Sequence, residues 1–421
     1  MKSFVALLFS MIALGCAGES DVRALRVANW GGAGSDSEFD RLVRDLYEEF
    51  EAQNPGVRVR VENNPEAYAA KMVLSFVAKA EPDIMMLDAS SAALFINNGV
   101  LADLEPLIAN DPTFRKDDFF PNVMDIARRG SSLFAIPQDF TPMVMYYNKR
   151  IFDRLGVAYP KAGWTIEQFR ETAKRLTRDG ETHGFVVKNW MPGWVMWIWN
   201  FGGDVVSPDG SSASGYFDGP SAVKAVQFLH DLVHVDKSAP TLSQVASMGV
   251  DPFVNGKAAM TISGHWSMIE FANAPKGPDG KKTLTWDDLG VVELPSLSGS
   301  SQTVMYESGY AIGKNSKNKD LAWKFIKFMT SYEVQKKYNS SGIAVCGRRD
   351  VALERSNEPL ESEFLAIVPQ CRAPHGARIE GYEFVENEGR NALDAVLQGI
   401  RTPQEALTRA AKRVDIQFAK K

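Results

Sequence analysis

The sequence has few of the residues that build metal or redox centres. Three cysteines occur in 421 residues, and neither a CxxC nor an HExxH motif is present, so the common zinc patterns are missing. No GxxxxGK[ST] motif occurs, which excludes a nucleotide-binding P-loop of that type. We therefore expect no metal and no cofactor. The formal net charge is −5, so the surface lacks the basic excess that recruits nucleic acid.

The chain also lacks long hydrophobic runs, except for one at its start. Lys2 precedes an apolar stretch that ends in Ala13-Leu14-Gly15-Cys16 and is shorter than the ~20 residues of a membrane span. This pattern predicts an export signal cleaved before Cys16. The last four residues resemble the lipobox of bacterial lipoproteins, which implies that Cys16 is lipidated and holds the protein at a membrane surface outside the cytoplasm. A polar tether follows.

If Cys16 carries lipid, Cys346 and Cys371 remain as an even pair in an oxidising compartment, and we predict a disulfide between them. Closing that loop would stabilise the fold by roughly 3.5 kcal/mol. Two buried free thiols are the alternative.

The mature chain would have about 400 residues, which is more than a single hydrophobic core usually holds. We therefore expect two lobes. Near the start, the predicted strand Leu25–Trp30, a helix over 39–50 and the strand Val57–Glu62 alternate. A helix over 68–80, the strand Asp83–Leu87 and a helix over 92–98 follow. Such alternation predicts an α/β fold with a parallel sheet, in which ligands bind beyond the carboxyl ends of the strands.

Three crossings between the lobes are predicted. The first is the polar segment Gln138–Pro142, the second follows Val291–Pro295, and the third lies near Ser331. The predicted division is a signal peptide at 1–15, a lipidated tether at 16–24, a first lobe of 25–139 and 295–331, and a second lobe of 140–294 and 332–421. Multiple crossings favour a hinge.

Several segments match one family in order along the mature chain. They include Phe50–Val57, Glu81–Ile84, Tyr147–Phe152 with Trp164-Thr165, Gly202–Asp204, Phe253–Met260, Gly264–Trp266 and Ala311–Ser316. The Tyr147 segment looks like the family's YNKxxF and P-x-TW pattern, except that Ala162-Gly163 departs from it at the proline. The chain thus resembles the extracytoplasmic sugar-binding proteins of bacterial ABC importers, which are maltose-binding-protein-like. The resemblance implies a type II two-lobe fold, closed by a hinge.

Tryptophan is concentrated in one place. Four of the nine tryptophans lie between Trp190 and Trp199. Flat aromatic faces suit the C–H patches of sugar rings, so we expect Trp194, Trp197 and Trp190 to face a ligand, whereas Trp199 packs inward. The alternative is that all four belong to the core. Trp164, Trp286 and Trp323 are assigned to packing.

The resemblance implies further site residues. Trp266 matches the tryptophan that stacks under the sugar in the family, and His265 replaces the usual proline, either at the cleft edge or bonded only to backbone. The first lobe offers the turn Trp30, Gly31 and Gly32 and the residues Asp88 and Ser90. The later crossings offer Tyr306, Glu307, Ser308, Gly309 and Arg348. Tyr68 and Gln138 are further candidates for the cleft only because of their positions in the sequence.

Carboxylates accept two hydroxyl groups at once, so Asp88, Asp139 and Glu307 are candidates for fixing a sugar ring. Helix caps or solvated surface acids are the alternative for each, and a surface ion pair is the alternative for Arg348.

These features predict a monomeric solute-binding lipoprotein that captures a carbohydrate, expected to be an oligosaccharide, by hinge closure and delivers it to the membrane subunits of an ABC importer. It is not expected to be an enzyme, although an extracytoplasmic glycoside hydrolase is the main alternative. A second alternative is that the same fold binds a sugar phosphate, polyol or other small solute. Arg348, Arg349 and Arg372 are the reason that an anionic sugar stays among the alternatives.

Overall fold

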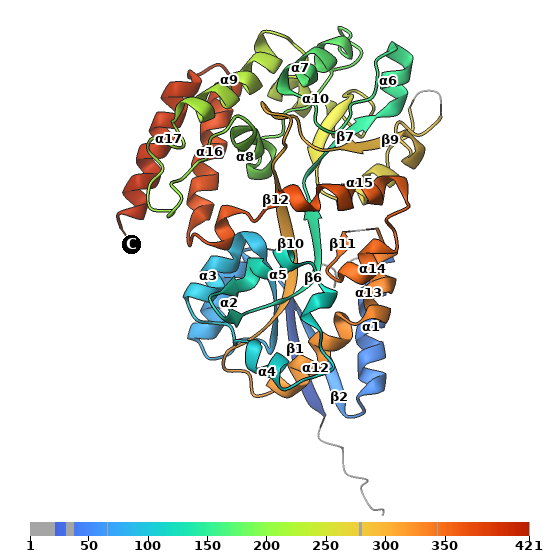
Figure 1. Cartoon of the computed structure of the whole chain (residues 1–421), viewed down its shortest axis with the longest axis vertical. Helices are drawn as coiled ribbons and strands as arrows, with labels where there is room; N and C mark the ends of the chain where they lie inside the picture. Colours follow the sequence, from blue (N-terminus) through green and yellow to red (C-terminus); the bar gives the residue numbers. More distant parts are fainter. Residues whose placement is uncertain (1–21, 31–37, 65, 278–279, 343, 421) are drawn as a thin grey trace, which may run out of the picture.

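The protein forms two lobes joined by extended strands, as a computed structural model shows (Figure 1). The structure describes residues 22–30, 38–64, 66–277, 280–342 and 344–420. The predicted signal peptide, Cys16 and the turn Gly31-Gly32 lie outside these residues. Among the described residues, no helix combines the length and the apolar character needed to cross a bilayer.

The first lobe is built on the larger sheet, whose strand order is β11-β6-β10-β3-β1-β2, with β12 paired to β10. β1 pairs in parallel with β2 and β3, whereas β10 is antiparallel to β3 and β6. The strands are β1 (Arg23–Asn29), β2 (Val57–Asn63), β3 (Ile84–Asp88), β6 (Ile136–Pro142), β10 (Thr303–Ile312), β11 (Val345–Cys346) and β12 (Cys371–Arg372).

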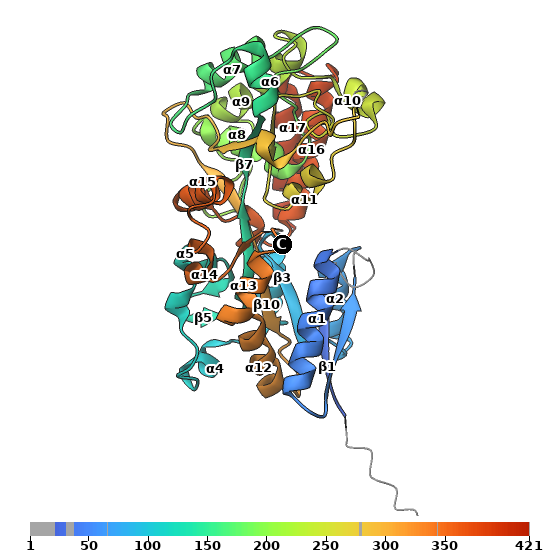
Figure 2. The ribbon, with the colours of Figure 1, turned by 90° about the vertical axis from the view of Figure 1, so that its right-hand side faces the viewer.

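Helices cover this sheet, and α1 and α2 lie beside β1 in Figure 2. The helix predicted over 39–50 is confirmed. As its amphipathic pattern indicates, Leu46 and Phe50 are buried in the core of the first lobe. The helices are α1 (Glu38–Gln53), α2 (Tyr68–Val77), α3 (Ala92–Asn97), α4 (Glu105–Ala109), α5 (Pro121–Met124), α12 (Lys319–Met329), α13 (Tyr332–Asn339) and α14 (Arg349–Leu353). A small hairpin of β4 (Arg128–Arg129) and β5 (Ser132–Leu133) completes the lobe.

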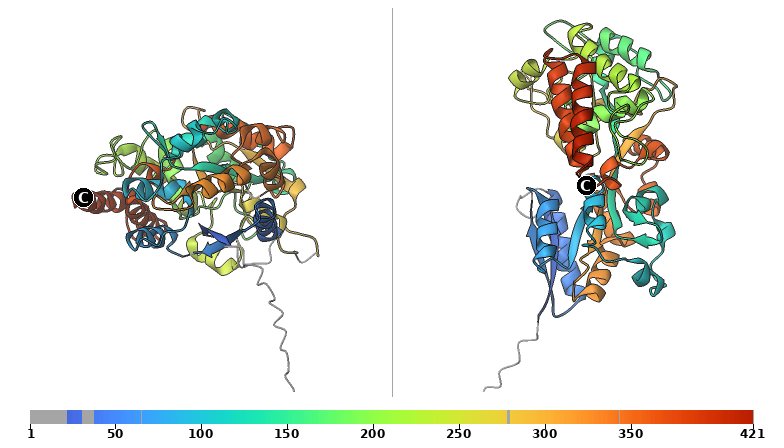
Figure 3. Two further views of the ribbon diagram at one scale, coloured as in Figure 1. Left: turned by 90° about the horizontal axis from the view of Figure 1, so that it is seen from below. Right: turned by 90° about the vertical axis from the view of Figure 1, so that its left-hand side faces the viewer.

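The second lobe surrounds a three-stranded antiparallel sheet of order β8-β7-β9. Its strands are β7 (Val144–Asn148), β8 (Met260–Ser263) and β9 (Leu289–Val292). Its helices are α6 (Lys149–Leu155), α7 (Ile166–Arg175), α8 (Met191–Asn200), α9 (Pro220–His234), α10 (Leu242–Met248), α11 (Ser267–Ala272), α16 (Tyr382–Leu397) and α17 (Pro403–Phe418). The red C-terminal helices α16 and α17 pack together on one side (Figure 3).

Several helices begin where side chains cap the free backbone N–H groups. Thr165 and Gln168 form a reciprocal capping box at α7, and Thr402 and Glu405 form another at α17. Each such cap stabilises its helix by about 1 kcal/mol.

Two crossing segments run side by side between the lobes. β6 passes through Met143 into β7, and the start of β10 lies against it, because the Met143 N–H donates to the Val304 carbonyl at 3.0 Å. The Thr303 hydroxyl also donates to the Met143 carbonyl at 2.6 Å. The polar segment Gln138–Pro142, predicted as the first crossing, lies within strand β6, which pairs with β10 and β11.

β11 pairs with β6 in the larger sheet, so the chain stays with that sheet beyond residue 331, where the third crossing was predicted. Helix α15 (Pro359–Ile367) then lies at the level of the crossing strands (Figure 1). The other predicted boundaries between the two lobes stay predictions.

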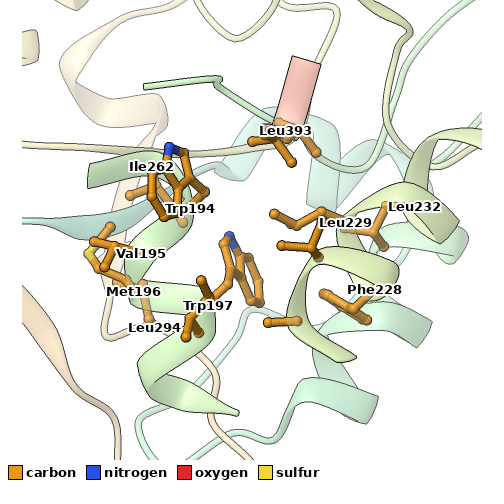
Figure 4. Packing of buried hydrophobic residues seen from close by; sticks show 14 of the residues in the cluster. Trp194, Val195, Met196, Trp197, Phe228, Leu229, Leu232, Ile262, Leu294 and Leu393 are labelled. Atoms are coloured by element: carbon orange, nitrogen blue, oxygen red, sulfur yellow. The ribbon is translucent and has the colours of Figure 1, made fainter. Parts of the chain in front are cut away.

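Trp194 and Trp197 belong to the core of the second lobe (Figure 4). Trp197 is fully buried and contacts the rings of Phe169 and Phe228, with centroids 5.1 and 5.3 Å away. Trp194 stacks on Phe217 at 5.7 Å. The two indole rings that were expected to face a ligand thus support α8 against its neighbouring helices.

The substitution Trp197→Ala should lower the free energy of unfolding by about 3–5 kcal/mol, because it removes a fully buried ring and leaves a cavity. Urea denaturation would measure this loss. Trp286→Ala, which removes an indole that is 46% exposed, is the matched control and should change stability by less than about 1 kcal/mol. Equal losses in the two variants would contradict the assigned packing.

Cys346 and Cys371 are both free thiols, so the predicted disulfide is wrong. Cys346 lies opposite Asp139 on β6, which in turn pairs with Ser308 of β10, whereas Cys371 pairs with Thr303. The two positions are five residue steps apart along β10, or roughly 16 Å along a strand. A disulfide requires Cα atoms within about 7 Å, so the pairing of the strands keeps the two thiols apart.

Candidate functional site

A cavity of about 630 Å³ lies between the lobes. Its lining comes from the ends of β1 and β3, from the crossing strands, and from three segments of the second lobe. Of the predicted site residues, the cavity brings together Trp30, Asp88, Ser90, Gln138, Asp139, Trp190, Trp266, Tyr306 and Ser308. This position agrees with the rule that ligands bind beyond the carboxyl ends of parallel strands.

Aromatic rings line the cavity on both sides. Trp266 lies between Trp190 and Tyr306, with ring centroids 6.0 and 6.4 Å away and ring planes at 79° and 66° to it. Trp30 faces them from the first lobe and packs edge-on against Tyr68, 5.3 Å away. Trp30, Trp190, Trp266 and Tyr306 are only partly buried, so part of the surface of each side chain is accessible.

The position of Trp266 depends on a neighbouring glycine. Trp266 is the residue before α11, in the turn that follows β8. A Cβ atom on Gly264 would lie 2.4 Å from the indole ring, so only glycine lets the ring lie over this turn.

Two carboxyl groups lie on the first-lobe side. Asp88 is the last residue of β3, and its Oδ1 accepts from the backbone N–H of Ser90 at 2.8 Å and from the Ser90 hydroxyl. Asp139 Oδ2 accepts from the Tyr338 hydroxyl at 2.5 Å and from Gln138 Nε2 at 3.3 Å. Burial raises the pKa of Asp88 and raises that of Asp139 to about 6, although these hydrogen bonds oppose the shift.

Sequence reasoning missed the contribution of α16. Glu386 and Arg390, one helical turn apart, line the cavity from the second lobe. Burial, followed by the charge of Asp88, raises the pKa of Glu386 to about 7. The helical period of α16 was readable, but nothing in the sequence indicates that this face of the helix lines the same cavity as the end of β3. Other lining residues that were missed are Asn29, Val43, Tyr47, Met86, Thr141, Tyr310, Tyr338 and Ala344.

Other predicted residues are not brought to the cavity. The Tyr68 hydroxyl donates to the Ala28 carbonyl at 3.1 Å, beneath Trp30. His265 is fully buried, with Nε2 2.9 Å from Glu361 Oε1. Arg348 pairs with Asp118 and Asp350 at 2.8 and 2.6 Å, which matches the alternative of an ion pair. Trp194 and Trp197 lie in the core, as described above.

Glu307 lies on the opposite face of β10 from Tyr306 and Ser308. It is 1% exposed, and neither carboxyl oxygen has a hydrogen-bond partner among the described residues. A Cβ atom on Gly309 would lie 2.3 Å from Glu307 Oε1, so Gly309 leaves room for this carboxyl group. Burial, with the nearby charges of Asp88 and Asp139, raises the pKa of Glu307 well above its usual value.

The substitution Glu307→Gln should stabilise the fold more at pH 8 than at pH 5. The native carboxyl keeps a proton that the unfolded chain releases above about pH 4.5, so the stability of the unsubstituted protein falls as pH rises, by up to about 1.4 kcal/mol per pH unit. Glutamine cannot ionise and loses this dependence. Urea denaturation at several pH values would measure the difference.

Glu171→Gln, on the exposed face of α7, is the control for that experiment, since its side chain is 67% exposed. A pH-independent difference between Glu307→Gln and the unsubstituted protein would contradict the buried, protonated carboxyl.

The comparisons with known proteins agree with this architecture. The profile of the bacterial extracellular solute-binding protein family matches residues 33–336. A binding protein of Brucella abortus is 24% identical over 396 residues, covering 90% of this chain and 91% of its own. The galactooligosaccharide-binding protein of Bacillus subtilis is 23% identical and covers 92% and 89%.

Among solved structures, the ABC substrate-binding protein Lmo0181 of Listeria monocytogenes, in complex with cycloalternan, has a TM-score of 0.80 at 22% identity. The match covers 95% of this chain and all of that one. The two-lobe fold predicted from the sequence is therefore confirmed. Because the family profile spans more than half of the chain, this protein belongs to the bacterial extracellular solute-binding proteins.

Proposed function

We propose that this protein captures a carbohydrate, an oligosaccharide, between its lobes and delivers it to the membrane subunits of an ABC importer. The observation that carries the proposal is the set of four partly open rings, Trp30, Trp190, Trp266 and Tyr306, around one interlobe cavity. Each ring offers an apolar face to the C–H groups of a sugar, and neighbouring polar groups bind its hydroxyls.

Hinge closure is the proposed mechanism. Because the cavity is lined from both lobes, a ligand makes more contacts when the lobes close and so shifts the equilibrium toward the closed form. A shift from 1:99 to 99:1 requires about 5.5 kcal/mol of preference. The side-by-side segments at Met143 and Val304 are the proposed hinge.

The membrane attachment belongs to the same proposal. Cleavage before Cys16 and lipidation of that residue would hold a monomeric protein at the membrane surface on the importer's outer side. Two signals or several acyl chains make such anchoring stable.

Charge separates carbohydrate from phosphate-containing solutes. Asp88, Asp139 and Glu386 line the cavity with Arg390 as the basic residue among the described lining. A phosphate group there would be repelled by the carboxylates. Two of the arginines that suggested an anionic sugar do not line the cavity. Arg348 pairs with Asp118, and Arg372 pairs with Asp204.

The substitution Trp266→Ala should weaken binding of the best saccharide at least tenfold, or about 1.4 kcal/mol, because the ring between Trp190 and Tyr306 is lost. Titration calorimetry would measure affinity, after a thermal-shift screen of mono- to tetrasaccharides has identified the ligand. A saturating ligand at 100 times its Kd adds about 2.7 kcal/mol of stability.

Trp286→Ala is the matched control, because this indole lies on the exposed surface and should leave affinity unchanged. If Trp266→Ala binds within twofold of the unsubstituted protein, the cavity is not the ligand site. New reducing ends after incubation with oligosaccharides would favour the glycoside hydrolase alternative instead.

A further inference from the structure

The charged side chains that line the cavity are mostly acidic. Asp88, Asp139 and Glu386 contribute three carboxyl groups, and Arg390 is the basic side chain among the described lining residues. Arg390 is exposed, so water screens its charge more than the charges deeper in the cavity.

Two of these carboxyl groups come from opposite lobes. Asp88 ends β3 in the first lobe, and Glu386 lies on α16 in the second. Both groups line the same cavity, and the charge of Asp88 adds to the effect of burial in raising the pKa of Glu386. Like charges that face each other across a closing cleft disfavour closure unless something compensates them.

Several acceptor atoms at this place have no hydrogen-bond partner among the residues that the structure describes. Glu386 makes no hydrogen bond or ion pair with a described residue, and both bonds of Asp88 go to its Oδ1 atom. Asn29 is only 9% exposed and lines the cavity, yet its Oδ1 has no partner among the described residues. A buried acceptor without a partner costs roughly 1–3 kcal/mol, which a donor on the ligand would recover.

The remaining walls suit a cation as well as a sugar ring. Trp30, Trp266 and Tyr306 carry negative electrostatic potential on their faces, which attracts a cation by about 0.5–2 kcal/mol. Carboxylates and aromatic faces in one cavity therefore both favour a positively charged group. The described residues contain no group of three His, Cys, Asp or Glu side chains that could hold a metal ion.

We propose that the preferred ligand is an amino sugar whose protonated nitrogen lies between Asp88 and Glu386. The inference rests on the proposed carbohydrate function and narrows its ligand class. A neutral sugar hydroxyl also donates to a carboxylate, but it brings no positive charge to these two carboxyl groups. An ammonium group donates up to three hydrogen bonds and removes the repulsion between the lobes.

The test uses sugars that differ only in the substituent at C2. Each set contains the hydroxyl, the amino and the N-acetylamino form of the same mono- to tetrasaccharide, and neutral α- and β-linked oligosaccharides complete the panel. Calorimetry with the full mature protein at pH 7 should give an amino sugar at least five times tighter than its hydroxyl and acetylated counterparts. An amino sugar with a smaller advantage over its counterparts overturns the proposal.

A charge-removing variant tests where the nitrogen lies. Glu386→Gln keeps the shape of the side chain, and the preference for the amino form should fall below twofold. Glu171→Gln removes an equal charge from the outer face of α7, where the side chain is 67% exposed, and should keep the full preference. Thermal unfolding of both variants checks that they fold. A preference unchanged by Glu386→Gln would overturn the assigned position.

The outcomes also separate this inference from the function beneath it. If a neutral saccharide is the tightest ligand of the panel, the amino-sugar proposal fails and carbohydrate capture stands. If no saccharide of any charge binds, both proposals fail.

Discussion

The pairing of β6 with β10 is the constraint on which the rest of the structure depends. These strands belong to the larger sheet and also carry the chain toward the second lobe, where Met143 and Val304 stay hydrogen-bonded. Because side chains alternate along a strand, β10 presents Tyr306 and Ser308 to the cavity and Glu307 to the opposite side. The junction between the lobes therefore forms part of the cavity wall, which couples lobe geometry to the site.

The second lobe adds rings and charge to this wall through three separate segments. Trp190 precedes α8, Trp266 precedes α11, and Glu386 lies within α16. The core around Trp197 supports α8, so a residue that does not line the cavity helps determine where Trp190 lies. Rigid packing behind open rings is what a preorganised binding surface requires.

Much of the fold could be predicted from local patterns, whereas the site could be predicted only in part. Trp266 lies in a recognisable turn, and Asp88 ends a buried strand, so both were found. Trp194 and Trp197 have the same chemistry as Trp190, and only packing against Phe217 and Phe228 separates core from cavity. Glu386 reaches the cavity through contacts far apart in sequence, which no short pattern encodes.

The separate thiols have a consequence for how this part of the chain is held together. Cys346 and Cys371 sit in distant parts of the strand network, and burial raises the pKa of each, which keeps them in the unreactive protonated form. No covalent cross-link between them has to be made before the lobes assemble. The pairing of β11 with β6 and of β12 with β10 thus rests on backbone hydrogen bonds rather than on oxidation of these two thiols.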